Sequence, residues 1–143
     1  MAGRTYMHQL DAKNRMRIPA KLRDELGANY SITVGSGGCL YVYTEAQTNK
    51  VKEKLNNINP FNEKQLQAAR FILAHSWEAE EDKQGRILIP EYIRNYAKIQ
   101  KNVVVFNGPN CIEIWAEEVW NAYFNEVDFG SLADVFSDGI NNG

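Results

Sequence analysis

Residues 10–26 read LDAKNRMRIPAKLRDEL, and residues 81–97 read EDKQGRILIPEYIRNYA. Placing Asp11 over Asp82 also places Arg15 over Arg86, at an offset of 71 residues. The Ile-Pro pair and a second arginine of each stretch coincide at the same offset. Self-similarity of this kind within one chain indicates an internal repeat. The two stretches therefore predict a duplicated, pseudo-symmetric fold.

Each copy begins with the same local pattern. The stretches TYMHQL and HSWEAE, and the shorter RMRI and RILI, alternate in a way that favours strands. In the turns DAKNR and DKQGR the fourth residue is Asn14 or Gly85, the residue types that best tolerate a left-handed backbone. Asp11 or Asp82 can accept hydrogen bonds from the amides of its own turn. A proline after each second strand suits the start of a short helix.

The remainder of each copy also repeats. YSITVGSGGCLYVY and KNVVVFNGPNCIEIW each predict a hairpin, and each is followed by a helical pattern. The connector NPFNEKQLQAARFILAH has its apolar residues at helical spacing, which predicts an ordered helix that docks the two copies. We therefore expect an α+β fold with a first repeat at residues 1–56, a connecting helix at 57–76, a second repeat at 77–127 and an acidic, flexible tail at 128–143.

Composition narrows the class of protein. The 143 residues carry a net charge of −2, but basic side chains dominate residues 1–23 and no Lys or Arg occurs in residues 113–143. The basic end could face a polyanion. The N-terminal stretch does not resemble a signal peptide, and no run of about 18 apolar residues exists, so we expect a cytoplasmic protein without a membrane partner. Cys39 and Cys111 occupy matching strand contexts and are interpreted as buried thiols, without a metal site.

The doubled D-x-x-x-R motif, each copy followed by Ile-Pro and a helix, resembles the MraZ family of AbrB-like, swapped-hairpin DNA-binding proteins, over about residues 1–127. The resemblance implies a pseudo-twofold, swapped-hairpin β-barrel with short helices and a connecting helix. It implies a bacterial transcriptional regulator, associated with the nucleoid, that binds short tandem repeats in the promoter of the division and cell-wall gene cluster. It also implies double-stranded promoter DNA and a ring of identical chains as partners, with no cofactor and no small-molecule substrate.

The residue types in the two turns suit contacts with DNA. Lysine offers a charge for phosphate, arginine offers a planar fork for guanine, and Asn or Gln can read adenine. The predicted DNA-binding residues are Lys13, Asn14, Arg15, Arg17, Lys83, Gln84 and Arg86. Asp11 and Asp82 are assigned to the structure of the turns, because a carboxylate facing phosphate would be repelled.

Three other interpretations stay open at this point. Arg15 and Arg86 could simply pair with Asp11 and Asp82 and touch no ligand. An enzyme is a second interpretation, but neither His8 nor His75 has a plausible nucleophile partner, and no glycine-rich phosphate loop occurs. The third is a non-enzymatic scaffold or antitoxin-like module that binds a protein through its aromatic C-terminal end, EIWAEEVWNAYFNEVDF. We expect no catalytic residue.

Overall fold

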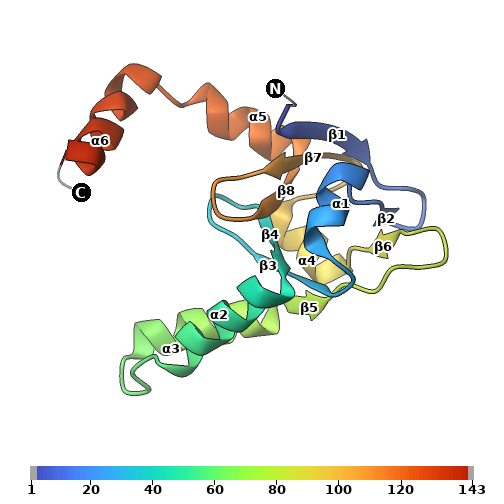
Figure 1. Cartoon of the computed structure of the whole chain (residues 1–143), viewed down its shortest axis with the longest axis horizontal. Coiled ribbons are helices and arrows are strands. Elements are labelled where there is room, and N and C mark those ends of the chain that lie inside the picture. The colour runs from blue at the N-terminus through green and yellow to red at the C-terminus, as the bar shows by residue number, and fades with distance from the viewer. Residues whose placement is uncertain (1–2, 142–143) are drawn as a thin grey trace.

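The computed structural model describes residues 3–141 and shows an α+β chain built on a six-stranded antiparallel sheet (Figure 1). The strands follow the order β1 (Thr5–Gln9), β7 (Asn102–Asn107), β8 (Ile112–Ala116), β4 (Leu40–Thr44), β3 (Tyr30–Val34) and β5 (Ser76–Glu78). A second sheet contains only β2 (Arg15–Met16) and β6 (Ile87–Leu88). The strands predicted in the two repeated stretches are thereby confirmed.

The two copies exchange strands across the sheet. Strand β1 of the first copy pairs with β7 of the second, with Tyr6 opposite Val105, and β5 of the second copy pairs with β3 of the first, with Trp77 opposite Ile32. At the centre, β4 pairs with β8 and joins the two hairpins. Strand β2 pairs with β6. Neither copy can complete its own sheet, so the two copies form one interlocked body.

The predicted closed barrel is wrong. Closure needs every strand to have a neighbour on both sides. Strands β1 and β5 instead lie at the two edges of the sheet, with four strands between them, and do not pair with each other. Strand β5 has only three residues, and the two-residue strands β2 and β6 pair with each other. With the outer sides of β1 and β5 unpaired among the described residues, the six-stranded sheet is open.

Six helices occur within residues 3–141: α1 (Ala20–Leu26), α2 (Glu45–Asn56), α3 (Glu63–Ala74), α4 (Glu91–Ala97), α5 (Glu117–Asn125) and α6 (Phe129–Asn141). Pro19 and Pro90 precede α1 and α4 as their N-cap residues. Thr44 caps α2 through a capping box with Gln47, whereas Ala116 at the equivalent start of α5 has no capping side chain. The connector is an ordered helix, α3, as its apolar spacing predicts.

The C-terminal segment, for which we expected flexibility, contains a helix. Residues 129–141 form helix α6, which projects from the body at the far left of Figure 1, and residues 142 and 143 lie outside the described part of the chain. The segment contains Leu132, Val135 and Phe136 at helical spacing, and this apolar pattern favours a helix despite the Gly and Asp residues. The flexibility of this segment stays a prediction.

The main hydrophobic core connects the two copies. Its members come from equivalent positions of both repeats, such as Leu22 of α1 and Ile93 of α4, which are 2% and 0% exposed. Met16 and Ile87, from the paired strands β2 and β6, are buried in the same cluster. This packing fixes the two D-x-x-x-R turns on one side of the molecule.

Candidate nucleic-acid interface

The two turns have the same hydrogen-bonded structure. In the first, the amide of Asn14 donates to the carbonyl of Asp11 at 3.0 Å, and the amide of Asp11 donates to the carbonyl of Arg15 at 2.9 Å. The second repeats both bonds at equivalent positions, with the amide of Gly85 donating to the carbonyl of Asp82 at 3.0 Å. Asn14 and Gly85 both have a positive φ, of 61° and 77°, so the predicted left-handed position is confirmed.

Each aspartate accepts hydrogen bonds from amides of its own turn. One oxygen of Asp11 accepts from the amides of Lys13 and Arg15, both at 2.9 Å. Asp82 accepts in the same way from the amides of Gln84, at 2.8 Å, and Arg86, at 2.9 Å. The amide hydrogen bond from Arg15 is the main reason why the pKa of Asp11 lies below its ordinary value. The amide of Arg86, with further bonds and charges, lowers the pKa of Asp82 to about 2.

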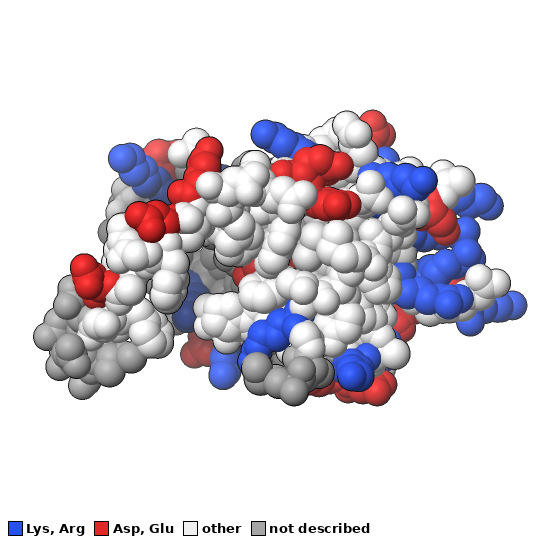
Figure 2. Space-filling view, turned by 90° about the horizontal axis from the view of Figure 1, so that it is seen from above, with Lys and Arg blue, Asp and Glu red and all other residues white. Residues whose placement is uncertain are grey.

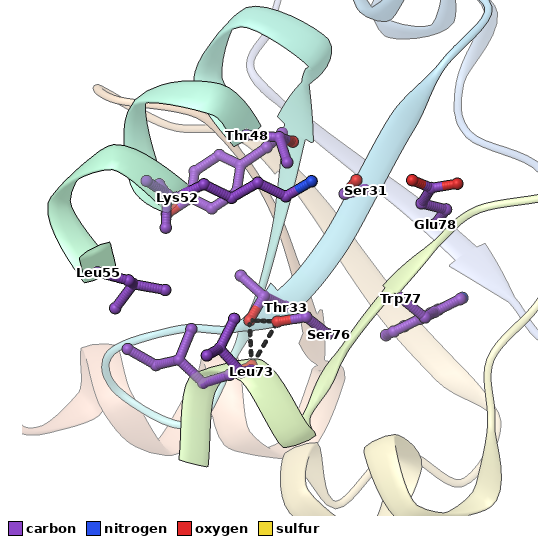
Figure 3. Close-up of a pocket in the computed structure, with 12 residues that line it drawn as sticks. Ser31, Thr33, Thr48, Lys52, Leu55, Leu73, Ser76, Trp77 and Glu78 are labelled. Atoms are coloured by element: carbon purple, nitrogen blue, oxygen red, sulfur yellow. Dashed lines mark hydrogen bonds between the residues drawn. The ribbon is translucent and has the colours of Figure 1, made fainter. Parts of the chain in front are cut away.

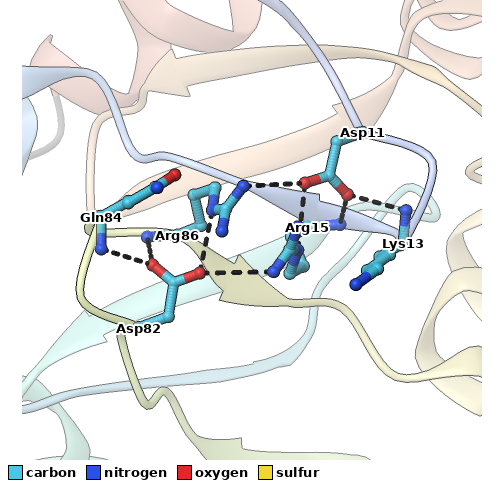
Figure 4. Close-up of polar contacts among 6 residues, drawn as sticks. All are labelled: Asp11, Lys13, Arg15, Asp82, Gln84 and Arg86. Atoms are coloured by element: carbon cyan, nitrogen blue, oxygen red, sulfur yellow. Dashed lines mark hydrogen bonds and ion pairs between the residues drawn. The ribbon is translucent and has the colours of Figure 1, made fainter.

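The arginines join the two turns in a reciprocal network of ion pairs (Figure 4). Nε of Arg15 binds Asp11 at 3.0 Å, and its Nη1 lies 3.6 Å from Asp82 of the other turn. Nε of Arg86 binds Asp82 at 2.8 Å, and its Nη1 lies 3.6 Å from Asp11. All four side chains are about a quarter to a third exposed, so solvent weakens each pair, but the network still fixes one turn against the other.

The network leaves polar groups directed to solvent. Lys13, Arg17, Lys83 and Gln84 are exposed, and Asn14 is half-buried. A guanidinium carries five N–H donors. In each arginine Nε donates to the aspartate of its own turn, and Nη1 lies 3.6 Å from the aspartate of the other turn. Figure 2 shows Lys and Arg gathered at the right-hand end of the molecule, where Figure 1 places the two turns. This end can therefore contact an extended polyanion.

The segments that follow the two turns differ at one exposed position. Arg17, exposed after strand β2, is equivalent to Leu88 of strand β6, which is 54% exposed. The first turn thus adds a cation where the second presents an apolar side chain. The sequence alignment contained this difference, but only the structure shows that both positions face solvent.

The two histidines and the two cysteines lie within or next to the secondary structure, or in the core. His8 lies in β1, and His75 follows α3, where its ring stacks on Phe71 at 4.0 Å. Cys39 and Cys111 are buried free thiols, as expected, and burial raises the pKa of each to about 12. These observations give neither histidine nor cysteine the partner that a nucleophilic site needs.

The aromatic C-terminal end packs within the chain. Trp115 of β8 lies 5.6 Å from Trp120 and 5.0 Å from Tyr123 of α5, measured between ring centroids. Trp120 in turn contacts Phe124 at 4.5 Å. The indoles thus belong to an intramolecular cluster between β8 and α5, although Tyr123 and Phe124 stay 49% and 45% exposed.

Comparison with known proteins identifies the family. The family model described as "MraZ protein, putative antitoxin-like" matches the chain twice, over residues 1–71 and 72–141. The second match begins 71 residues after the first, which is the offset of the doubled turn. The chain belongs to the MraZ family.

Curated MraZ relatives align along almost the whole chain. Transcriptional regulator MraZ of Thermoanaerobacter sp. (strain X514) is 43% identical over 136 residues, which cover 93% of this chain and 94% of the relative. Transcriptional regulator MraZ of Clostridium beijerinckii is 42% identical over 135 residues, with the same coverage of each chain. These MraZ relatives carry the names of regulators and not of enzymes. No helix within residues 3–141 is long and apolar enough to cross a membrane.

Substitutions at Gly85 test the left-handed turn of this MraZ chain. We expect Gly85→Ala to lower the free energy of unfolding by about 1–2 kcal/mol, the cost of a side chain at positive φ. No atom lies within 4 Å of the added Cβ, so the loss comes from the backbone alone. Gly85→Asn should cost less, because Asn14 holds the equivalent position. Urea unfolding measures both, and an Asn variant no more stable than the Ala variant would contradict this explanation.

The lowered pKa of Asp82 predicts a loss of stability in acid. Because the folded pKa is about 2 and the ordinary value is 3.8, the stabilisation is complete above pH 3.8 and is lost as the pH falls towards 2. We expect the stability difference between the wild-type chain and Asp82→Asn to shrink over that interval. Urea unfolding across the interval measures it, with Asp24→Asn on the exposed side of α1 as control. A constant difference would contradict the role of the ionised carboxylate.

Proposed function

We propose that the protein is a DNA-binding transcriptional regulator that contacts duplex DNA through its two D-x-x-x-R turns. The observation that carries this proposal is the reciprocal network, which presents two equivalent turns together on one basic end of the molecule. The names of the MraZ relatives support the same function. A pre-organised pair of turns contacts DNA with little further loss of conformational entropy.

The side chains divide the work of recognition by their chemistry. Lys13, Arg17 and Lys83 provide charges for phosphates. Asn14 and Gln84 can each form two hydrogen bonds with adenine in the major groove. Arg15 and Arg86 keep their Asp contacts through Nε and Nη1 while Nη2 donates to phosphate or guanine. On this assignment the same arginine both holds its turn and contacts DNA.

The finer assignment rests on the family resemblance. The proposed operator is a set of short tandem repeats in the promoter of the division and cell-wall gene cluster, read in the cytoplasm at the nucleoid. The proposed assembly is a ring of identical chains, because several pairs of turns on one body raise the effective concentration at repeated sites. The exchanged strands suit the AbrB-like swapped-hairpin class, with boundaries at residues 1–56, 57–76 and 77–127.

A titration with DNA tests the proposal. The full chain is mixed with the duplex upstream of its own gene and, separately, with a shuffled duplex of equal length and composition. Gel shifts are recorded at 50 and 200 mM salt, concentrations over which proteins with about 6–10 phosphate contacts lose roughly 10³–10⁵ in affinity. We expect preferential, salt-sensitive binding to the upstream duplex. Equal affinity for both duplexes would refute specific regulation, and no binding at either salt would refute the function.

A further inference from the structure

Helix α6 presents an exposed apolar surface. Phe129, Leu132, Val135 and Phe136 are 76%, 47%, 68% and 73% exposed. Their spacing places them on one side of the helix. In Figure 1 the helix stands clear of the sheet, on the opposite side of the molecule from the two turns. Contiguous apolar groups of this kind mark an interaction site more often than an inert surface.

A pocket of about 260 Å³ opens between α2, α3 and the strands β3 and β5 (Figure 3). Most of its wall is apolar, with Val51 and Leu55 from α2, Leu73 from α3 and Trp77 from β5. Lys52, which also lines the pocket, extends from α2 towards Ser31 of β3. The space is suited to one or two large apolar side chains.

Two hydroxyl groups of the pocket are occupied with each other and with one backbone carbonyl. The hydroxyl of Ser76 donates to Thr33 at 2.6 Å and also contacts the carbonyl of Ile72. The hydroxyl of Thr33 lies 3.4 Å from the same carbonyl. Because these two hydroxyl groups already have partners, a polar ligand would gain little from them. An apolar occupant loses nothing by leaving them as they are.

The charges around the two surfaces are opposite in sign. Helices α2 and α3 carry five basic residues against three acidic ones: Lys50, Lys52, Lys54, Lys64 and Arg70, with Glu45, Glu53 and Glu63. Residues 117–137 carry only acidic side chains: Glu117, Glu118, Glu126, Asp128 and Asp134. Complementary charge favours an encounter between these two parts of different molecules.

The two copies of the repeat also differ at this point. Helix α3 follows the first repeat and lies beside α2 in Figure 1, where both helices line the pocket. Helix α6 follows the second repeat but extends away from α5. Within residues 3–141, α3 therefore lies beside a helix of the first repeat, whereas α6 has no such neighbour.

We propose that the apolar side of α6 binds in the α2–α3 pocket of a second copy of this chain. The inference deepens the proposed function, on whose self-assembly it rests. The contact joins two different surfaces, so each molecule can give one helix and receive another. Heterologous contacts of this kind close into a ring when the rotation between neighbours allows it. The turns are left free, because they lie on the other side of each molecule.

A charge placed on the apolar side of α6 tests the contact. Phe136→Asp is compared with Ser137→Asp, which adds the same charge to the neighbouring, exposed position of the helix. Light scattering after size exclusion should give an assembly for the wild-type chain and for Ser137→Asp, and the mass of a single chain for Phe136→Asp. Circular dichroism checks that both variants fold. A monomeric wild-type chain, or an unchanged assembly of Phe136→Asp, would overturn the proposal.

Cross-linking identifies the partner surface. A Leu73→Cys chain is mixed with a Phe136→Cys chain under mild oxidation, and the native Cys39 and Cys111 are buried. We expect a disulfide-linked pair from the mixture, at least tenfold more abundant than with Ser137→Cys in place of Phe136→Cys. No excess over that control would overturn the pocket assignment. A chain carrying both Leu73→Cys and Phe136→Cys should also link between molecules, and a link formed only within one chain would refute the second copy as occupant.

The DNA experiment and the assembly experiment test different proposals, and either proposal can be refuted without the other. Phe136→Asp should retain salt-sensitive binding to a single operator repeat. Its affinity for tandem repeats should fall at least tenfold, because the turns of different chains are no longer linked in one assembly. Assembly through α6 without DNA binding would refute the proposed function alone. If the Phe136→Asp chain still assembles like the wild-type chain and binds DNA, this inference alone is refuted.

Discussion

Replacing both arginines of the network, Arg15→Ala with Arg86→Ala, should reduce affinity for the operator duplex by about 100-fold or more at physiological salt. Each contact that reads a base contributes about 1–3 kcal/mol, and each lost phosphate contact lowers the salt slope by about one. The substitution also leaves Asp11 and Asp82 without their cations on the surface that faces DNA. The added repulsion acts in the same direction as the lost contacts.

Matched variants separate this effect from a general loss of charge. Lys64→Ala removes one exposed charge from α3, on the helical side of the molecule, and should leave operator affinity almost unchanged. Gel shifts measure affinity, and light scattering confirms that the assembly of each variant is unchanged. If the double arginine variant retains wild-type affinity, the arginines only structure the turns, and the assignment of the turns to DNA loses its central residues.

The double substitution Lys13→Ala with Lys83→Ala distinguishes the role of the lysines in DNA binding from that of the arginines. Both lysines are exposed and belong to none of the ion pairs of the network, so their removal should leave the turns folded. Affinity should then fall about equally for specific and shuffled duplexes, as expected for phosphate contacts. The arginine variants should instead reduce the preference for the operator. The same response in both sets would mean that the arginines read no base.

Leu22→Ala and Ile93→Ala should each lower the free energy of unfolding by about 2–5 kcal/mol, the usual cost of emptying a buried large aliphatic position. The two residues are equivalent in the repeats, and both lie in the main core. Because that core and the exchanged strands connect the copies, damage to either copy should destabilise both. Urea unfolding at one fixed protein concentration measures the loss.

Tryptophan fluorescence reports the unfolding of the second copy alone. All three, Trp77, Trp115 and Trp120, belong to the second copy. Leu22→Ala lies in the first copy, yet it should shift the fluorescence transition as much as the transition seen by circular dichroism. An unshifted fluorescence transition would show that the copies unfold independently. Leu88→Ala, at a position 54% exposed, serves as control and should change stability by no more than about 0.5 kcal/mol.

The sequence alone determined the local features of this protein. The left-handed positions Asn14 and Gly85, the aspartates that bind the turn amides, and the capped start of α2 at Thr44 all depend on groups a few residues apart. Interactions of such short range have few alternatives, so residue type and spacing predict them. The doubled motif also indicated the family, because two copies of one pattern rarely arise together by chance.

Only the tertiary structure decided which distant segments meet. The sequence does not specify that β1 pairs with β7, that the sheet remains open, or that Arg15 lies 3.6 Å from Asp82 of the other turn. Each repeat carries equivalent strands, so pairing within a copy and pairing between copies satisfy the same pattern of apolar residues. The choice follows from burying both repeats in one core, a property of the whole chain that no short stretch contains.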